Sequence, residues 1–367
     1  MKKWPTVSLG DVVELQRGYD LPEQERHAGP FPIVGSAGPN GSHERANVKA
    51  PGVVIGRSGA GFGSAHYCDT DFWALNTGLF VKNFRHNHPK FVFYLLDDLD
   101  FTKYNSGGAQ PSLNRNFIYP IQVHLPSWDE QEKIADLLSR WDTATQKTEQ
   151  LIAAKERHYS RELSRLISRG QHHPHAHVDA FAEEISVRNR GGNEARVLSV
   201  TNSRGFVLPE DQFERRVASA DLSNYKVVRR GQYAYNPSRI NVGSIARLDG
   251  WDDGVLSPMY VVFRLDEAKV DSDYFLHWLN SHEARQRIKN SAQGSVRETV
   301  SFSEFSALTI PLPDTVTQAG IARYLNALRE EIDLLGQSVA ALKTQKRGLM
   351  QKLLTGQWRL PVQEEAS

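Results

Sequence analysis

The sequence has almost no cysteine, no long apolar run and no excess of charge of one sign. Its one cysteine, Cys68, excludes an internal disulfide and is typical of a protein kept in a reducing cytoplasm. No apolar run approaches the roughly 20 residues that a membrane span needs, so we expect no membrane association. The opening stretch MKKWPTVSLG has two lysines but no apolar signal-peptide core, and we therefore expect a cytoplasmic protein.

The charges of the chain are balanced. Its 44 lysines and arginines stand against 43 aspartates and glutamates, for a formal net charge of +1. Nucleic-acid-binding proteins usually carry an excess of basic residues, so an anionic partner would have to be met by local basic patches. With 40% hydrophobic and 10% aromatic residues, the chain can build real cores. The length of 367 residues predicts two or three domains.

The sequence contains no convincing catalytic centre. The stretch from Gly56 to Ser64 lacks the Gly-Lys-Ser/Thr ending of a phosphate loop and precedes a strand-like segment. We therefore interpret it as a hairpin loop and keep its Arg57 and Ser58 as candidate contacts to DNA. In Tyr235-Asn236-Pro237-Ser238, only Asn236-Pro237 matches the Asn-Pro-Pro-aromatic motif of amino-methyltransferases. No glycine-rich cofactor loop lies upstream.

Two other segments contain residue types that can bind a metal or act as a nucleophile. Four histidines lie within 171–177, but their spacing matches no closed tetrahedral metal site and Pro174 interrupts them. We expect this segment to be a solvated linker without a metal. Cys68 ends the alternating stretch Ala65-His66-Tyr67-Cys68, which is typical of a strand, so we expect it to pack in a core rather than act as a nucleophile.

The clearest feature of the sequence is a heptad pattern, typical of a long helix, that occurs twice. Positions three and four residues apart match between the copies at one constant offset, so that Ile134 corresponds to Ile321 and Leu166 to Leu353. The second copy is almost unbrokenly apolar at these positions, and the first is more polar, with Thr145 and Thr148 among them. A sustained 3.5-residue period predicts coiled-coil pairing, and its repetition predicts a tandem duplication of globular domain plus long helix. The residues that we expect to pair are Ile134, Leu138, Trp141, Ile152, Ile321, Leu325, Leu328, Ile332, Leu335, Val339 and Leu342.

The globular segments that precede the two helices also share one plan. Short apolar runs separated by Gly, Pro and Asn clusters predict short strands with tight turns, and residues 91–99 predict a short helix. Asp129 is a candidate N-cap for the first long helix. The apolar skeleton repeats but the loops between its strands diverge. One scaffold is therefore expected to present two different surfaces.

The divergent loops are rich in side chains that read bases or hold phosphates. Arginine pairs bidentately with guanine, and asparagine or glutamine with adenine, whereas serine and lysine suit phosphates. In the first globular segment the candidates are Arg57, Ser58, Lys103, Asn105, Gln110, Asn114 and Arg115. In the second they are Arg204, Asn236, Arg239, Asn241, Ser295 and Arg297.

Several short motifs connect these segments to a known family. Leu125-Pro126, Glu130-Gln131 and Ile134-Ala135 recur as Leu312-Pro313, Gln318 and Ile321-Ala322, and 7–12, 257–260 and 349–356 are also typical of it. Over nearly its whole length the chain resembles the specificity subunit of type I restriction–modification systems. The second copy departs from the pattern in having Val316-Thr317 where the first has Asp129-Glu130.

The resemblance implies an α+β fold in which two mixed α/β target-recognition domains are joined by two long antiparallel coiled-coil helices. With the boundaries given by the sequence, the order is target-recognition domain 1 (1–125), helix 1 (126–170), a His-rich linker (171–177), target-recognition domain 2 (178–312), helix 2 (313–356) and a C-terminal tail (357–367).

The resemblance also implies a function. Each target-recognition domain would read one half of a split, asymmetric double-stranded DNA site. The chain would be non-catalytic and bind no cofactor. Its partners would be two methyltransferase subunits, which carry S-adenosylmethionine, and two ATP-driven translocase–nuclease subunits, with ATP and Mg also on the partners.

Three alternatives remain open from the sequence. The chain could be the specificity subunit of a type IIB-like restriction enzyme, whose methyltransferase and nuclease are fused. It could be a coiled-coil-tethered protein that binds carbohydrate or protein instead of DNA, in which case DNA retention would not fall steeply with salt. It could also be an enzyme whose site is dispersed over loops.

Overall fold

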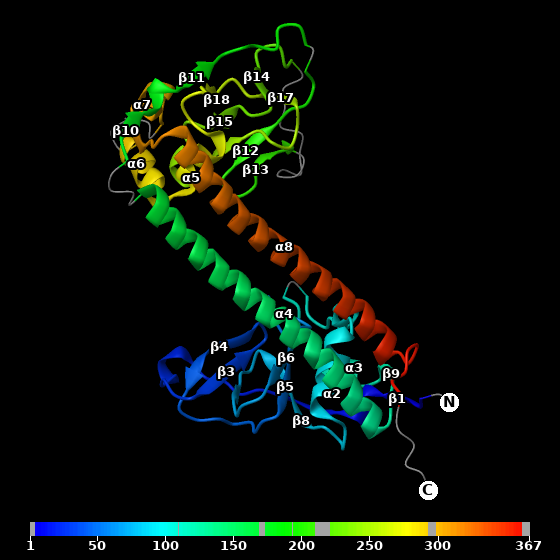
Figure 1. The fold of residues 1–367 in the computed structure, drawn as a ribbon. Coiled ribbons are helices and arrows are strands. Elements are labelled where there is room, and N and C mark those ends of the chain that lie inside the picture. The colour runs from blue at the N-terminus through cyan, green and yellow to red at the C-terminus, as the bar shows by residue number, and fades with distance from the viewer. Residues whose placement is uncertain are drawn as a thin grey trace. The chain divides into compact units, whose positions relative to one another are not determined.

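The computed structural model describes residues 4–108, 110–168, 173–192, 194–209, 221–292 and 299–361 (Figure 1). The chain divides into two compact units, which are described one at a time. The first unit comprises Met1–Glu149 and Gln337–Ser367, and the second comprises Gln150–Gly336. Each unit therefore contains one globular part and a segment of each long helix.

The centre of the first unit is a four-stranded antiparallel sheet in the order β2-β8-β5-β6. Its strands are β2 (Glu14–Arg17), β5 (Gly52–Gly56), β6 (Ala65–Cys68) and β8 (Gly78–Asn83). Every residue of β5 is buried, as its run of small and β-branched side chains requires. As expected, Cys68 packs in a core, and burial raises the pKa of its thiol to about 12.

Smaller elements complete the first unit. They are β1 (Thr6–Ser8), α1 (Leu9–Val12), β3 (Phe31–Gly35), β4 (Gly38–His43), β7 (Trp73–Ala74), α2 (Pro89–Asp98), α3 (Arg115–Ile118) and β9 (Gln122–His124), with 3-10 turns at Glu23–Glu25 (η1) and Phe101–Tyr104 (η2). The apolar face of α2 joins the same core as β5 and the end of the last long helix, through Phe91, Val53 and Leu353. Antiparallel pairing of β1 with β9 closes the unit.

The second unit repeats this plan. Its four-stranded antiparallel sheet has the order β11-β18-β15-β16, with β11 (Ala182–Ile185), β15 (Tyr233–Tyr235), β16 (Ile245–Arg247) and β18 (Val261–Leu265). The other elements are β10 (His175–His177), β12 (Ser199–Thr201), β13 (Gly205–Val207), β14 (Lys226–Arg229), β17 (Asp253–Leu256), α5 (Ser272–Asn280), α6 (His282–Ala292), α7 (Phe302–Ser306) and β19 (Thr309–Pro311), with 3-10 turns η4 (Val178–Ala180) and η6 (Ile240–Val242). Its core is rich in aromatic rings, and Phe263 contacts five others.

Part of the His-rich segment is a strand and not the linker that the sequence suggested, although His175 and His177 are exposed, as expected of a solvated segment. His175–His177 form strand β10, which pairs antiparallel with β19 as β1 pairs with β9 in the first unit. The His177 ring nitrogen Nδ1 lies 2.8 Å from the carbonyl oxygen of Ala307, and the next residue, Val178, is fully buried. The segment is therefore the opening strand of the second unit. Residues 171–172 lie outside the described part of the chain.

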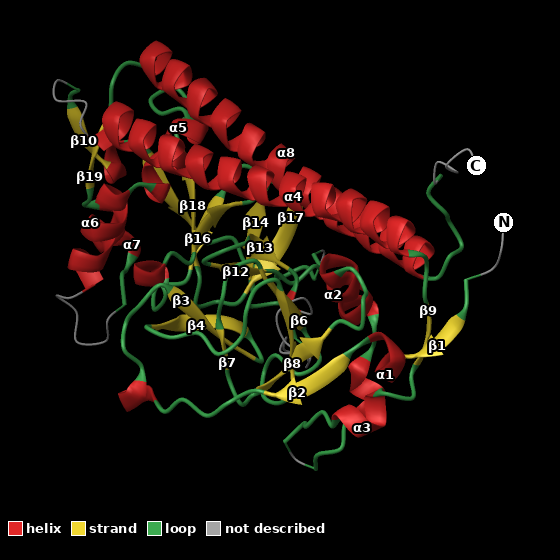
Figure 2. Cartoon of the chain, turned by 90° about the horizontal axis from the view of Figure 1, so that it is seen from below, coloured by secondary structure: helices red, strands yellow, loops and turns green. Residues whose placement is uncertain are grey.

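Two long helices follow the globular parts. Helix α4 (Trp128–Leu163) continues into a π-helical turn (η3, Ser164–Ser168), and α8 spans Thr315–Leu354 (Figure 2). The N-cap of α4 is Ser127 rather than Asp129: the Ser127 hydroxyl and backbone N–H both donate to the carboxylate of Glu130, as in a capping box. Asp314 caps α8, accepting from the N–H of Thr317.

Within each unit the two helix segments run side by side in opposite directions. In the first unit Lys346 and Lys343 of α8 bind Asp142 and Glu149 of α4, with N–O distances of 2.5 and 2.7 Å. In the second unit α4 and α8 are joined by Lys155–Glu331 at 2.6 Å and Glu156–Arg329 at 3.1 Å. Several of these ion pairs are substantially exposed, so each contributes little stability, but together they define the register of the two segments.

The residues expected to pair are distributed over the two units. Ile134 and Leu138 are buried in the first core, and Ile321, Leu325 and Ile332 in the second, against which Ile152 and Leu328 are partly buried. Val339 is buried, whereas Trp141, Leu335 and Leu342 are half-buried. These heptad residues, which we call the seam of each helix, therefore pack into the globular cores as well as against the facing helix. Continuous coiled-coil pairing stays a prediction.

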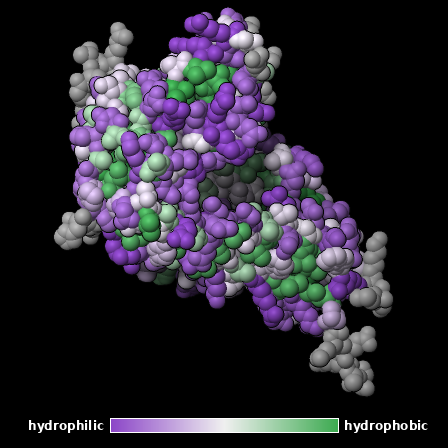
Figure 3. All heavy atoms as spheres, turned by 45° about the horizontal axis from the view of Figure 1, so that its top comes forward, coloured by the Kyte–Doolittle hydropathy of each residue, from purple (hydrophilic) through white to green (hydrophobic). Residues whose placement is uncertain are grey.

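Apolar residues do not form one continuous area on the face of the molecule that Figure 3 shows. The face shown in Figure 3 is mostly hydrophilic, with apolar residues in separate groups. Among the helices of the described residues, none combines the length and hydropathy needed to cross a membrane. The same residues contain no group of three or more His, Cys, Asp or Glu side chains arranged to hold a metal ion.

Candidate nucleic-acid interface

The hairpin loop between β5 and β6 carries Arg57 and Ser58, and its glycines are required by its shape. A Cβ on Gly56 would lie 1.8 Å from the carbonyl oxygen of Gly61, and Gly59 has a φ of +78°. Side chains at these positions would break the turn. The glycine-rich pattern therefore builds a tight hairpin, as the sequence indicated, and presents the two polar residues at its start.

A second segment of the first unit, residues 105–108 and 110–115, lies against this hairpin loop. The N–H of Leu113 donates to the carbonyl of Arg57 at 2.8 Å, and Ser58 and Ser112 form a β-bridge. The side-chain oxygen of Asn105 accepts from the N–H of Ser112, which holds the segment in its turn. Two loops far apart in the sequence are thereby fixed as one surface.

This surface surrounds a hollow of about 430 Å3 in the first unit. Of the predicted residues it brings together Arg57, Asn114 and Arg115, and it adds Gln16 and Arg17 from the end of β2, which the sequence did not single out. Three arginines in one hollow provide the local basic patch that a balanced net charge requires of an anion-binding protein.

The other predicted residues of the first unit have mixed roles. Arg115 donates from Nη1 to the carbonyl of Leu15 at 2.8 Å, so it also holds the loop to β2. Asn114 caps α3 by accepting from the N–H of Asn116. Lys103 lies on η2, 3.5 Å from a carboxylate oxygen of Asp100, and its side chain is exposed. Gln110 is exposed and lies outside the hollow.

The second unit places its loops in the same way. The loop between β15 and β16 contains Asn236, Arg239 and Asn241, and the N–H of Val300 donates to the carbonyl of Pro237 at 3.0 Å. This bond is the counterpart of Leu113–Arg57 in the first unit. Asn236 is buried, and its side-chain oxygen accepts from the N–H of Ser238, so it shapes the loop. Arg239 is exposed.

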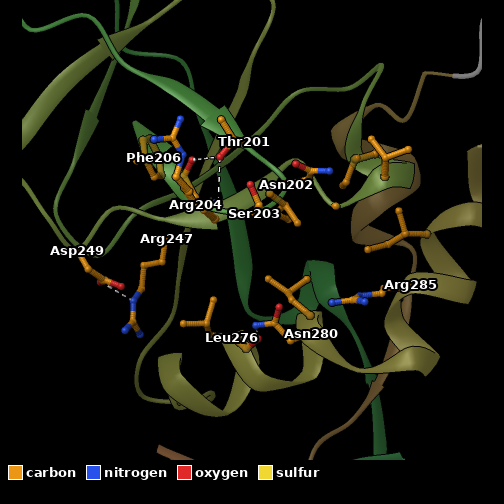
Figure 4. Close-up of a pocket in the computed structure, with 18 of the residues that line it drawn as sticks. Thr201, Asn202, Ser203, Arg204, Phe206, Arg247, Asp249, Leu276, Asn280 and Arg285 are labelled. Carbon is orange, nitrogen blue, oxygen red and sulfur yellow. Dashed lines mark hydrogen bonds and ion pairs between the residues drawn. The ribbon is translucent and has the colours of Figure 1, made fainter. Parts of the chain in front are cut away.

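A cleft of about 760 Å3 lies beside this loop in the second unit (Figure 4). Two predicted residues, Arg204 in the β12–β13 turn and Asn241 in η6, line it. The cleft also contains Arg247, Asn280 and Arg285, which the sequence did not single out. Ser295 and Arg297 lie outside the described residues.

Arg247 is held in the wall of this cleft by two carboxylates. It donates from Nε to Asp249 at 2.7 Å, and its Nη1 lies 2.7 Å from a carboxylate oxygen of Asp273. Burial alone would raise the pKa of the Asp273 carboxyl, but hydrogen bonds from Arg247 and Asn326 lower it below its ordinary value. The charge of Arg247 is thus compensated internally.

The residues that the sequence missed share one property. Arg17 stands at the end of a short strand, and Asn280 and Arg285 lie on helices. None of them belongs to a loop that diverges between the two copies. Only the tertiary packing of these elements beside the hairpin loops brings them to the site, and no sequence spacing indicates it.

The two units therefore define a duplicated mixed α/β scaffold. In each copy, two loops joined by a backbone hydrogen bond lie beside a polar hollow. The sequence model of the type I restriction modification DNA specificity domain matches residues 1–156 and 238–344, more than half of the chain. The chain belongs to this family.

Individual relatives agree with this assignment. The chain is 24% identical over 143 residues to the type I restriction enzyme EcoprrI specificity subunit of Escherichia coli, a match that spans only 36% of that protein and 38% of this chain. It is 20% identical over 312 residues to the MjaX specificity subunit of Methanocaldococcus jannaschii, covering 72% of that protein and 78% of this chain.

Solved structures share the fold. The S subunit of a type I restriction-modification system from M. genitalium superposes with a TM-score of 0.65 at 14% identity, over 96% of each chain. A chain from a structure of type I R-M complex assembly and conformational transition gives 0.58 at 14% identity, over 98% of this chain and 99% of that one.

Proposed function

We propose that this chain is the DNA-reading specificity subunit of a type I restriction–modification complex. Each unit reads one half of a split, asymmetric site in double-stranded DNA. The observation that carries the proposal is a backbone hydrogen bond that joins two loops in each unit. It runs from Leu113 to Arg57 in one unit and from Val300 to Pro237 in the other. The same scaffold presents different polar side chains at the same place, as two independent readers require.

The two long helices set the distance between the half-sites in this proposal. They pair as an antiparallel coiled coil and carry one recognition domain at each end. Helices α4 and α8 are 36 and 40 residues long, which at about 1.5 Å per residue corresponds to about 54–60 Å. This length leaves an unread spacer between the two half-sites.

Catalysis belongs to the partners in this proposal. Two methyltransferase subunits with S-adenosylmethionine modify adenine, and two translocase–nuclease subunits use ATP and Mg. The chain itself supplies binding and orientation on DNA in the cytoplasm. Its base readers are drawn from the exposed loop residues of the two hollows, and its basic residues neutralise phosphates.

A domain exchange tests the proposal directly. Residues 1–125 are replaced with the corresponding segment of a related specificity subunit, and methylated adenines are mapped in a genome that expresses the chimera with its methyltransferase partner. One half of the methylated motif is expected to change while the other half and the spacer persist. If both halves change together, the units do not read independently. A continuous palindromic motif for the natural chain would contradict the split-site proposal.

A further inference from the structure

The cleft of the second unit has two walls of different origin. One wall is the β12–β13 turn with η6, which belongs to the divergent loops. The other is formed by α5 and α6, from which Asn280 and Arg285 face the turn (Figure 4). The volume of the cleft is about 760 Å3.

Two arginines that line the cleft, Arg247 and Arg285, differ in how their charges are compensated. Arg247 is bound to Asp249 and Asp273, and its side chain is only 17% exposed. The guanidinium of Arg285 is exposed and has no hydrogen-bond or ion-pair partner within the described part of the chain. In Figure 4 it extends from its helix into the space between Asn202 and Asn280. Arg285 is thus a cation in the cleft wall available to an external anion.

The backbone of Arg285 is rigidly placed. Its neighbours on α6, Ala284 and Ile288, are 0% and 3% exposed and belong to the core of the second unit. The Ser281 hydroxyl accepts from the N–H of Ala284 at 3.1 Å and caps the first turn of the helix. The point from which the Arg285 side chain extends is therefore fixed relative to the core of the second unit.

The element that carries Arg285 has a counterpart in the first unit. Helix α6 follows α5 as the 3-10 turn η2 follows α2, and both elements insert a buried residue into the core, Ala284 and Phe101. The next positions in η2 include Lys103. The sequence assigned Lys103 to a divergent loop, but the structure places it on η2, two positions after Phe101, and Arg285 lies one position after Ala284. Each unit thus carries a basic residue near the same place in its scaffold.

We propose that Arg285 holds a phosphate of the DNA backbone, opposite the base-reading wall of the cleft. The inference rests on the proposed function and names the surface on which one DNA strand is held. Contacts to phosphate fix orientation and carry no sequence information, which suits the repeated scaffold, whereas base reading suits the loops that differ. The planar guanidinium provides two parallel donors for a phosphate.

The test is the salt dependence of binding by the full chain to duplex DNA, measured by fluorescence anisotropy. Arg285→Gln is compared with the natural chain on the recognised duplex and on single-base variants of it. Affinity should fall by a similar factor on every duplex, and the slope of log K against log salt should become shallower by about 0.9 for the lost phosphate. Arg285→Lys should retain most of the slope, because it keeps the charge.

Arg264→Gln is the matched control. Arg264 lies on β18 outside the cleft, its side chain is 60% exposed, and it is ion-paired with Glu183. This variant should bind with the natural slope. Thermal unfolding of each variant establishes that the fold is unchanged.

The outcomes separate the two proposals. If the natural chain binds DNA with a steep salt dependence but Arg285→Gln has the same affinity and slope, the phosphate role of Arg285 is wrong and the proposed function stands. A loss confined to one base pair would make Arg285 a base reader and overturn the inference. Binding of the natural chain that does not respond to salt would overturn the proposed function itself.

Discussion

Tyr94 on α2 and His277 on α5 hold corresponding positions in the two units, at the same separation from the N-caps His88 and Asp271. Tyr94 donates its hydroxyl to Asp142 of α4 at 2.6 Å, and the ammonium of Lys346 on α8 lies 5.0 Å from its ring centre. His277 bonds Tyr159 of α4 and Asn326 of α8, both at 2.8 Å. In each unit, one polar side chain of a short helix, Tyr94 of α2 or His277 of α5, thus contacts both long helices.

Removing the Tyr94 hydroxyl should weaken this contact. We expect Tyr94→Phe to lower the free energy of unfolding of the first unit by about 1–3 kcal/mol, because Asp142 loses a donor in a partly buried place. Hydrogen–deuterium exchange of α2 and α4 measures the change. Tyr324→Phe is the control: that hydroxyl is exposed and 3.4 Å from His158, so its loss should cost less than about 0.5 kcal/mol. Equal effects of the two variants would contradict the assigned role of Tyr94.

The stability of the second unit should depend on pH through His277. Burial lowers the pKa of His277 below its ordinary value of 6.5, although the hydrogen bond to Asn326 opposes this shift. The unfolded chain therefore takes up a proton that the folded unit excludes, so stability is complete above about 6.5 and falls as the pH drops below it. The free energy of opening of α5, obtained from exchange rates corrected for the intrinsic pH dependence of amide exchange, should fall less steeply from pH 7.5 to 5.5 in His277→Gln than in the natural chain. Equal slopes would contradict this account.

Two buried glutamines should each stabilise their own unit. Gln131 accepts from the N–H of His88 and donates to Pro126, and Gln318 accepts from the N–H of Asp271 and donates to Pro313. Each glutamine thus ties the start of a long helix to the start of α2 or α5.

We expect Gln131→Ala to destabilise only the first unit and Gln318→Ala only the second, by about 1–3 kcal/mol for each buried group left unpaired. Local hydrogen exchange distinguishes the units. Gln345→Ala, at an exposed position of α8, is the control. Destabilisation of both units by one variant would show that they do not unfold separately.

Arg239 and Arg115 should differ when replaced by alanine. Arg239 is exposed, so its loss should weaken binding to the recognised duplex by about 1–3 kcal/mol at one base pair and leave stability unchanged. Arg115 also bonds the carbonyl of Leu15, and its variant should lose local stability as well. Binding to single-base variants of the site, with thermal unfolding alongside, measures both effects. Loss that is uniform over all variants would make Arg239 a phosphate anchor.

Shortening both helices by one heptad should shorten the recognised spacer. Deleting 145–151 and 332–338 keeps both seams in register and removes about 10 Å of helix, close to three base pairs of rise. Methylation mapping with the partner subunits present should find the same half-sites closer together. Deleting three residues from each helix should rotate the seams and abolish binding. An unchanged spacer in an active, heptad-deleted protein would contradict the role of the helices.

The sequence predicted the long helices and the duplicated plan because heptad spacing is a local pattern that repeats. It missed β10, since His175–His177 has no apolar alternation and becomes a strand only by pairing with β19. It identified Arg57 and Asn114 because they lie in polar loops. It missed Arg17 and Arg285, which reach the hollows through packing of β2 and α6. Proximity of that kind depends on tertiary contacts that no spacing along one chain encodes.

The first unit is built from two separate stretches of the chain, and this has a consequence for the order of folding during synthesis. Its core includes Met350 and Leu353, and buried Glu130 binds both Trp4 and Arg359. The second unit is one continuous stretch, Gln150–Gly336, and emerges from the ribosome before those residues exist. The part of the protein made first is therefore completed last. Until then, the apolar side chains that α8 will cover face solvent, which makes the nascent first unit the half more dependent on chaperones.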